Sequence, residues 1–191
     1  RLDFRMGVAV GFRSGLEKWL VASSETITLS RFNGMRKLGP LELAITDWRA
    51  QTLSTWATDG DIARLSIPDE KDLDWVHSVC DPSDDFNTPL KGPFTPIFGG
   101  SVDVSRTALA ICKTAHLIPS AVMVNITDQD IAGLDFIDLE QILSLILNPS
   151  NQLIEVSAAN VPLQVAEASR VHVFRPQDGG EEHYAIEIGN P

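Results

Sequence analysis

The chain has 191 residues, of which 43% are hydrophobic and 21% charged, and this balance excludes a disordered tail or a fibrous repeat. The 26 acidic residues outnumber the 15 lysines and arginines, so the net charge is −11. A surface this negative repels phosphate backbones and anionic lipid headgroups, and we therefore expect neither a nucleic-acid nor a membrane partner. The apolar run at residues 142–147 is far shorter than the roughly 20 residues that span a bilayer.

The cysteine and histidine content argues against a metal site in this chain. Cys80 and Cys112 lie far apart in the sequence, and residues 1–10 lack the pattern of a secretory signal. We therefore expect two reduced thiols in a cytoplasmic protein. No pattern of the HExxH or CxxC type includes a histidine or cysteine of this chain, and the four histidines, His77, His116, His172 and His183, share no common motif.

The first 67 residues alternate strand and helix signals. Short apolar runs at residues 8–10, 20–22 and 41–45 predict buried strands. Thr28 is the expected N-cap of a helix whose apolar residues recur on one face, and Gly39-Pro40 ends that helix. This alternation predicts helices layered on a sheet, in an α/β or α+β domain.

A second helix is expected to begin at Thr46, with Trp48, Leu53 and Trp56 as its apolar face. Residues 68–100 then contain five prolines and read as a long loop. A loop of this length is either a functional lid or a segment that crosses the domain. Its aromatic residues favour a crossing segment, packed through Trp75, Phe86, Phe94 and Phe98.

The clearest helix signal follows residues 99–101. An apolar stripe predicts a helix that packs on the core, through Val104, Ala108, Ile111, Cys112 and Ala115. Residues 121–126 read as a buried strand, and Asp138 is expected to cap a short helix that runs to residue 146. Both predictions extend the alternating pattern of the first 67 residues.

The tail reads as extended strands. Residues 171–173 and 184–188 alternate apolar and polar side chains, and the segment 176–180 between them has the Asp-Gly chemistry of a hairpin turn. We therefore expect two parts, residues 1–149 and 150–191.

Two places in the sequence attract a functional interpretation. Ser101 begins the strongest helix, where free backbone N–H groups and the helix dipole attract anions. It is either an ordinary cap or a phosphate-binding residue with Arg106 as the nearest cation. Glu17 precedes a buried strand, as catalytic carboxylates do at sheet edges, but a surface turn is favoured. The acidic clusters at 69–74 and 81–85 are expected to be solvated surface rather than a metal site.

Three stretches resemble proteins of riboflavin synthesis. Residues 6–53, which include Leu-Val-Ala-Ser-Ser-Glu-Thr, resemble 3,4-dihydroxy-2-butanone 4-phosphate synthase, as do residues 107–146, which include Ala-His-Leu-Ile-Pro-Ser-Ala-Val. Residues 170–191, which begin Arg-Val-His-Val-Phe-Arg-Pro, are similar to the first hairpin of GTP cyclohydrolase II. The resemblance implies a synthase-like mixed sheet with helices packed on it in residues 1–149, then a linker and a truncated GTP cyclohydrolase II-like hairpin in 150–191.

The departures from these families bear on activity. The resemblance implies that an active synthase binds Mg²⁺ through a glutamate in an acid-rich loop and a histidine in a Gly-His-Thr-Glu motif. Residues 11–18 keep one carboxylate, Glu17, and residues 99–103 read Gly-Gly-Ser-Val-Asp without a histidine. A hard divalent cation needs several oxygen ligands. We therefore expect no metal and no catalysis in this chain, with Glu17 and Asp103 as the remaining catalytic candidates.

The resemblance thus implies a non-catalytic scaffold or dimerisation domain of a cytoplasmic GTP cyclohydrolase II-type hydrolase, present as a homodimer. It places the zinc of GTP cyclohydrolase II, held by three cysteines, in a part that follows residue 191. Two alternatives stay open. One is a residual Mg²⁺-dependent lyase that acts on ribulose 5-phosphate, and the other is a regulatory domain that binds a small-molecule phosphate or a nucleotide.

Overall fold

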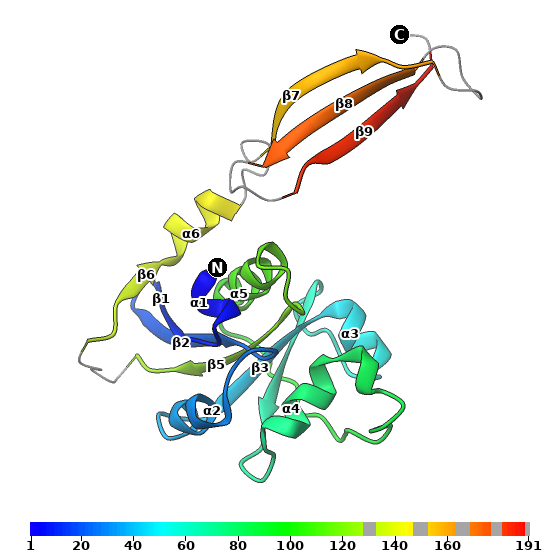
Figure 1. Ribbon diagram of the computed structural model, residues 1–191. Coiled ribbons are helices and arrows are strands. Elements are labelled where there is room, and N and C mark those ends of the chain that lie inside the picture. Colours follow the sequence, from blue (N-terminus) through cyan, green and yellow to red (C-terminus); the bar gives the residue numbers. More distant parts are fainter. Residues whose placement is uncertain (128–132, 147–152, 163–168, 177–180, 190–191) are drawn as a thin grey trace. The chain divides into compact units, whose positions relative to one another are not determined.

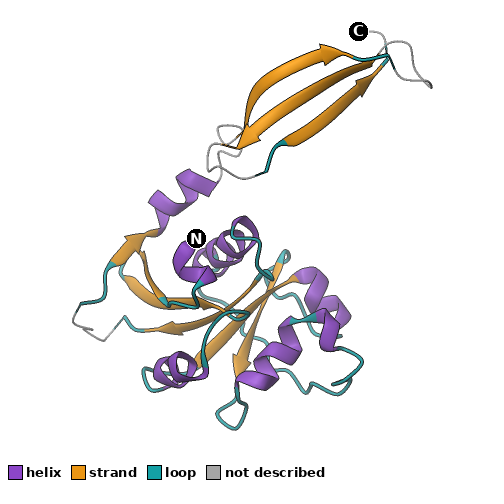
Figure 2. Cartoon of the chain, viewed as in Figure 1, coloured by secondary structure: helices purple, strands orange, loops and turns teal. Residues whose placement is uncertain are grey.

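A computed structural model describes residues 1–127, 133–146, 153–162, 169–176 and 181–189. The chain divides into two compact units, Arg1–Leu143 and Ser144–Pro191. The predicted boundary between residues 149 and 150 lies outside the described residues. Helices and strands alternate in the first unit, whereas three strands form the sheet of the second (Figure 2). In the described ranges, no helix combines the length and apolar character needed to cross a membrane.

The first unit contains a six-stranded sheet with helices on both faces (Figure 1). Its strands are β1 (Val10–Ser14), β2 (Glu17–Ser23), β3 (Leu41–Thr46), β4 (Ile62–Ile67), β5 (Ser120–Asn125) and β6 (Phe136–Asp138). Its helices are α1 (Leu2–Arg5), α2 (Leu29–Arg36), α3 (Asp47–Thr52), α4 (Leu73–Cys80), the 3₁₀ helix η1 (Pro82–Asp84), α5 (Asp103–Thr114) and α6 (Leu139–Ile146), whose last residues belong to the second unit.

The strand order is β4-β3-β5-β2-β1-β6. Neighbouring strands are antiparallel except β1 and β6, which are parallel. This mixed sheet with packed helices confirms the predicted α/β (α+β) fold class. The first strand begins later than predicted, because Val8 and Ala9 precede β1 and do not pair.

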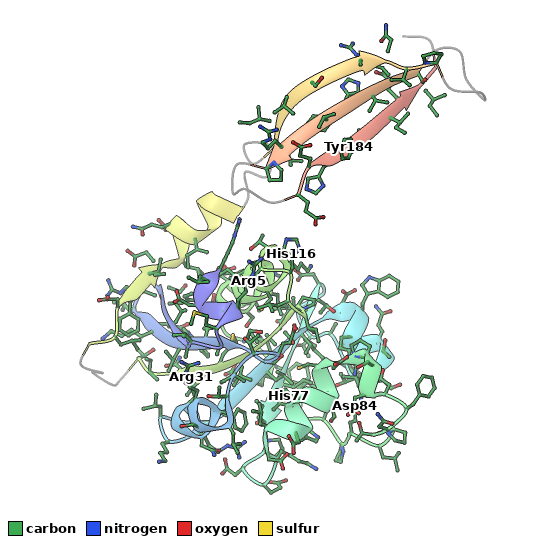
Figure 3. The ribbon with its side chains drawn as sticks, viewed as in Figure 1. Arg5, Arg31, His77, Asp84, His116 and Tyr184 are labelled. Carbon is green, nitrogen blue, oxygen red and sulfur yellow. The ribbon has the colours of Figure 1, made fainter. Side chains whose placement is uncertain are left out.

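Side chains alternate between the two faces of the sheet, and each face has its own helices. One face packs against α2 and α4 in a core that includes Phe32, Leu43 and Val76. On the other face, α5 contacts β5, β2 and β3, and the Phe4 ring of α1 stacks on Phe12 with centroids 6.3 Å apart. Arg5 Nε donates to the Ala115 carbonyl at 2.8 Å, which fixes α1 to the C-terminal end of α5, beside His116 (Figure 3).

Two of the predicted N-caps, Thr28 and Thr46, are confirmed, whereas the N-cap residue of α5 is Val102 and not Ser101. The side chain of Thr28 accepts a hydrogen bond from Arg31 N, and that of Thr46 accepts one from Arg49 N. The interpretation of 68–100 as loop is wrong in part, because α4 occupies Leu73–Cys80. Its N-cap, Asp72, accepts from Trp75 N at 3.0 Å and lies within the acidic cluster that was expected to be surface loop.

The predicted apolar face of α3 holds for Leu53, which packs against the core, and is wrong for the two tryptophans. Trp48 and Trp56 are exposed, whereas Ala50 and Arg49 are buried. Arg49 is buried because its guanidinium donates hydrogen bonds to carbonyls at the C-terminal end of α4. The sequence around Arg49 does not indicate these acceptors, because they lie in another helix.

The segment that follows α4 packs through fewer aromatic residues than predicted. The rings of Trp75 and Phe94 pack against each other, 6.2 Å between centroids. Phe86 and Phe98 point into solvent instead. The prediction of a crossing segment therefore holds for the first pair of rings and fails for the second.

The second unit is a three-stranded antiparallel sheet in the order β7-β8-β9, with β7 Leu153–Asn160, β8 Ser169–Pro176 and β9 His183–Ile188. The predicted hairpin corresponds to β8 and β9, in which Val171 pairs with Ile186 and Val173 with Tyr184. The sequence interpretation did not distinguish β7 as a third paired strand. The predicted turn at 177–180 lies outside the described residues.

Candidate functional site

The start of α5 is the first candidate site. Gly99 and Gly100 both have φ of +74°, a backbone conformation that glycine adopts without strain. Ser101 Oγ donates to Asp103 Oδ2 at 3.3 Å and accepts from Asp103 N at 3.3 Å, while Val102 is the N-cap residue. The polar side chains at this helix start therefore bond to each other.

Arg106, the predicted phosphate-binding cation, has an acidic partner within the chain. Its Nε lies 3.0 Å from Asp61 Oδ1, its Nη2 lies 2.8 Å from the same oxygen, and Nη2 also donates to the Asp59 carbonyl at 3.2 Å. The hydrogen bond from Arg106 holds the pKa of Asp61 below its usual range. An anion that used Arg106 would have to displace this carboxylate.

Arg64, in β4, lies beside the same helix start and is almost fully buried. Its Nε donates to Asp59 Oδ2 at 2.9 Å, and its Nη2 donates to the Gly99 carbonyl. A Cβ added at Gly100 would approach Arg64 Nη1 to 3.8 Å, an ordinary contact. Arg64 therefore fastens the loop before α5 to the edge of the sheet.

Glu17 and Glu42 form a second group of carboxylates. Glu17 Oε2 accepts from the indole Nε1 of Trp19 at 3.1 Å. Glu42 Oε2 is buried and has no hydrogen-bond partner in the part of the chain that the structure describes. Burial raises the pKa of Glu42, the charge of Arg64 opposes that shift, and the charge of Glu17 adds to it.

Each predicted site residue thus has a hydrogen-bond partner, but the predicted residues do not come together in one site. In the described ranges, no hydrogen bond or ion pair joins Glu17 to Asp103. Sequence reasoning missed Arg64 and Glu42, although a signal was present. Each is a charged residue inside an otherwise apolar strand, Leu-Glu-Leu-Ala-Ile and Ile-Ala-Arg-Leu-Ser-Ile.

A third cluster ties α3, α4 and the following segment together. The Asp85 carboxylate accepts from Arg49 Nη1 at 2.7 Å and Nη2 at 2.6 Å, and it also binds Lys91 Nζ. Both cations are buried and also donate to the Ser78 carbonyl near the C-terminal end of α4, where the helix dipole favours positive charge. Hydrogen bonds from Arg49 hold the pKa of Asp85 far below its usual range.

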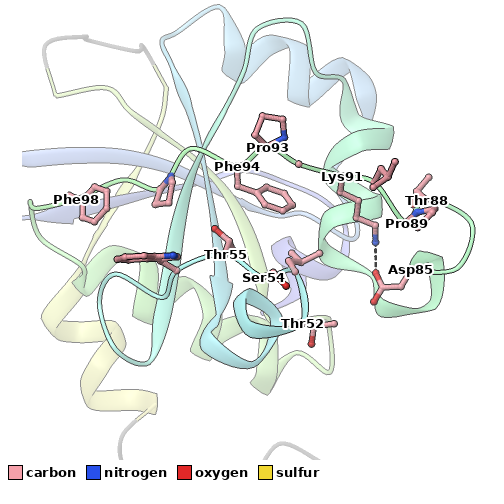
Figure 4. A pocket seen from close by; sticks show the side chains of 15 residues that line it. Thr52, Ser54, Thr55, Asp85, Thr88, Pro89, Lys91, Pro93, Phe94 and Phe98 are labelled. Atoms are coloured by element: carbon pink, nitrogen blue, oxygen red, sulfur yellow. Dashed lines mark hydrogen bonds and ion pairs between the residues drawn. The ribbon is translucent and has the colours of Figure 1, made fainter.

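A cavity of about 900 Å³ lies beside this cluster. Figure 4 shows hydroxyl side chains of Thr52, Ser54 and Thr55 on one side, with Phe94 facing them and the Asp85–Lys91 pair at one end. Thr88 and Gly92 also line the cavity, and the rest of the lining consists of apolar side chains and prolines: Leu53, Trp56, Pro89, Leu90, Pro93, Pro96 and Phe98.

The donor set does not fit the Mg²⁺ of the synthases that the sequence resembles. The described residues contain no group of three or more histidine, cysteine, aspartate or glutamate side chains arranged to hold a metal ion. Glu17 accepts a hydrogen bond from an indole and Asp103 accepts one from a hydroxyl, and among the described residues neither carboxylate belongs to a cluster of metal-binding side chains. The two cysteines are free and buried, and burial raises the pKa of Cys112 to about 12.

The fold and these clusters define a two-unit α/β protein whose polar groups around α5 are paired within the chain. No family model matches it. The chain is 30% identical over 159 residues to the GTP cyclohydrolase-2 of Azospirillum brasilense, a match that covers 78% of this chain and 41% of that protein. The chain therefore spans about two fifths of this relative's length. The similarity supports the expected relationship to GTP cyclohydrolase II-type proteins, whereas the resemblance to the synthase stays a prediction.

Proposed function

We propose that this chain is a non-catalytic scaffold domain of a GTP cyclohydrolase II-type protein of riboflavin synthesis. The similarity to a GTP cyclohydrolase-2 supports the pathway. The observation that carries the non-catalytic role is the internal pairing around α5. Arg106 is held by Asp61, and Arg64 by Asp59 and the Gly99 carbonyl.

A sugar phosphate needs cations and hydrogen-bond donors that are free to turn toward it. Here the nearest guanidinium groups already have carboxylate partners at hydrogen-bond distance, and the Ser101 hydroxyl is bonded to Asp103. Binding a phosphate at α5 would therefore exchange one charge-assisted contact for another rather than add one. This supports a role in folding and assembly over a role in chemistry.

The test is an assay of the purified chain with ribulose 5-phosphate and Mg²⁺. We expect formate release no faster than in a protein-free control, and no rise of the melting temperature with ribulose 5-phosphate, because ligand that binds the native state raises it. Circular dichroism of the same sample verifies that the protein is folded. Formate release at an enzymatic rate would overturn the proposal and restore the lyase alternative.

A further inference from the structure

The cavity beside the Asp85–Lys91 pair has the dimensions of a ligand site. Its volume of about 900 Å³ falls within the roughly 300–1,000 Å³ that small-molecule sites enclose. Three of the hydroxyl groups that line it belong to the C-terminal end of α3 and the turn that follows, whereas Phe94 belongs to the segment that follows η1 (Figure 4). Two segments that are distant in the sequence therefore form its facing walls.

The wall that carries Phe94 is held in place from behind. The Phe94 ring packs against Trp75, with centroids 6.2 Å apart, and the Trp75 indole Nε1 donates to the Lys91 carbonyl at 2.9 Å. The Lys91 ammonium group in turn donates to the Ser78 carbonyl and to Asp85. Phe94 thus offers a preorganised aromatic surface, so that stacking a flat ring on it requires little ordering of the protein.

The facing wall contains a residue in an unusual backbone conformation. Ser54 follows the C-cap of α3 with φ of +55°, in the left-handed region that glycine adopts without strain. Ser54 N donates to the Gln51 carbonyl at 3.0 Å and Thr55 N donates to the Ala50 carbonyl at 2.9 Å, which are the two hydrogen bonds of a helix end that favours glycine. A serine at this position is strained, and such strain gathers at functional sites.

The hydroxyl groups of this wall are available to a ligand. Thr52 Oγ1 donates to the Trp48 carbonyl at 3.0 Å, but in the described ranges neither Ser54 Oγ nor Thr55 Oγ1 forms a hydrogen bond. A hydroxyl both donates and accepts, so each can pair with a ring nitrogen or with a carbonyl oxygen. Ser54 therefore brings to the cavity a polar group that glycine, the residue that fits this backbone, does not have.

The charges around the cavity favour an uncharged ligand. Among the residues that line it, Asp85 and Lys91 carry charge, and they pair with each other. Lys91 is buried and its ammonium group is already bound, so it is not free to turn toward a phosphate or a carboxylate. A cationic ligand would have to compete with Arg49 and Lys91 for Asp85. The net charge of −11 repels anions further.

The rest of the lining favours a flat aromatic ligand over a sugar. It is mostly apolar, with Trp56, Phe94 and Phe98 as its aromatic members. A sugar has a hydroxyl on most of its carbons, and many of these would lose their hydrogen bonds to water against such a lining. A heteroaromatic ring has two apolar faces that stack on aromatic side chains, and polar atoms at its edge, where a few hydroxyl groups suffice.

We propose that this cavity binds an uncharged heteroaromatic ring, stacked on Phe94 and hydrogen-bonded at its edge by the hydroxyl groups of Ser54 and Thr55. The inference goes beyond the scaffold role, which assigns no ligand to the chain. Among the described residues that line the cavity, none belongs to α5, so the lyase assay does not bear on the proposal and either can fail alone.

Riboflavin is the probe, because its ring system is heteroaromatic, coloured and uncharged at neutral pH. Equilibrium dialysis against the full 191-residue chain is expected to give a dissociation constant of about 10–100 μM. Flavin mononucleotide carries the same ring and a phosphate. It is expected to bind at least about 3-fold more weakly, because the one cation that lines the cavity in the described ranges is already paired.

Ser54→Gly separates the strain of the turn from the binding of a ligand. Glycine relieves the left-handed backbone, so this variant is expected to melt about 2–4 °C higher than wild type. It also removes a hydroxyl, and we expect riboflavin to bind about 5-fold more weakly. A purely structural role for Ser54 would give the first effect without the second. Thr55→Val, which removes the other hydroxyl at nearly constant volume, is expected to weaken binding by a similar factor.

Two tryptophans of nearly equal exposure provide a matched control. Trp56 is 75% exposed and lines the cavity, whereas Trp48 is 77% exposed and does not. Trp56→Leu is expected to weaken riboflavin binding about 10-fold, because an aromatic contact is lost. Trp48→Leu is expected to change it by less than about two-fold. Both side chains lie largely in solvent, so both variants are expected to fold, and circular dichroism verifies that.

Three results would overturn the proposal. One is the absence of riboflavin binding up to about 200 μM, above the expected range of the dissociation constant. A second is an equal loss of binding in Trp48→Leu and Trp56→Leu, which would place the ligand outside the cavity. The third is tighter binding of flavin mononucleotide than of riboflavin, which would show that the site recognises an anion.

Discussion

The start of α5 and the segment after η1 differ in how their side chains are satisfied. Around α5, charged side chains that could bind a ligand are paired with carboxylates of the same chain, as Arg106 is with Asp61 and Arg64 with Asp59. In the segment after η1, the apolar side chains of Phe86 and Leu90 are almost fully exposed. The charged side chains are thus paired in the region that the sequence resemblance marks for chemistry, while the region interpreted as a loop presents apolar surface to solvent.

The contrast shows that two structural properties help to locate a binding surface: whether a polar side chain already has a partner within the chain, and whether an apolar side chain is exposed to solvent. A satisfied polar group gains little from a ligand, because one set of hydrogen bonds replaces another. An exposed apolar side chain gains free energy from any complementary cover, about 25 cal/mol for each Å² removed from water.

The largest effect is expected from Asp85→Asn, because the Asp85 carboxylate binds two buried cations and joins the segment after η1 to α3. Removing the carboxylate leaves Arg49 and Lys91 buried without an acidic partner, and we expect a loss of about 3 kcal/mol of unfolding free energy. Residues 86–91 would also lose their anchor to α3. Urea denaturation at pH 7 measures the loss of stability.

The stability that the Asp85 carboxylate contributes should depend on pH. The pKa of Asp85 is lowered in the folded chain from its ordinary value of 3.8, chiefly by hydrogen bonds from Arg49. The stability contributed by the carboxylate is therefore fully present above that ordinary value and is lost as the pH falls below it. Wild type should lose stability between about pH 5 and pH 2 more steeply than Asp85→Asn. Parallel curves would contradict a structural role for the carboxylate.

A smaller effect of opposite sign is expected from Glu42→Gln. Burial raises the pKa of Glu42 above its ordinary value of 4.5. Stability due to its protonated form is thus present below pH 4.5 and lost as the pH rises through the raised pKa. At pH 7 the neutral glutamine should stabilise the chain by about 1 kcal/mol. The gain should vanish near pH 4 and be absent in the control Glu70→Gln, an exposed carboxylate.

The smallest effect on stability is expected from Asp61→Asn. The ion pair with Arg106 is exposed, so its loss should cost about 0.5 kcal/mol. The informative readout is the melting temperature in phosphate buffer. Because the variant releases Arg106, phosphate should raise its melting temperature more than that of wild type, and the double variant Asp61→Asn/Arg106→Gln should abolish the difference. An equal response in wild type would show that the guanidinium is already accessible to anions.

Much of the fold could be predicted because its signals are local. Thr28 and Thr46 each cap the helix that begins at the next residue, and the buried apolar residues of α5 recur with the helical period. The missed helix, α4, begins at Asp72 inside an acidic run, where a cap and a solvated loop look alike in sequence. The exposure of Trp48 could not be predicted, because the position of Arg49 depends on carbonyls about 30 residues away in the chain.

The candidate site was harder to predict than the fold. The sequence identified Arg106 as a cation near the helix start, but its partner Asp61 lies 45 residues earlier in the chain. The pairing of Arg64 with the Gly99 carbonyl likewise joins two segments that meet only after the sheet has formed. Residue types and spacing indicate which groups can act, whereas the topology decides which groups are already paired.

The segment after η1 runs along β4, the outer strand of the six-stranded sheet. Ser66 N donates to the Thr95 carbonyl at 2.9 Å, and Ile97 N donates to the Arg64 carbonyl at 2.8 Å. Pro93 and Pro96 have no N–H group to offer to a further strand. This proline-bearing cover closes the β4 edge against strand addition, the usual route to aggregation. A chain that keeps large apolar side chains in solvent is thereby protected from strand-by-strand growth at this edge of its sheet.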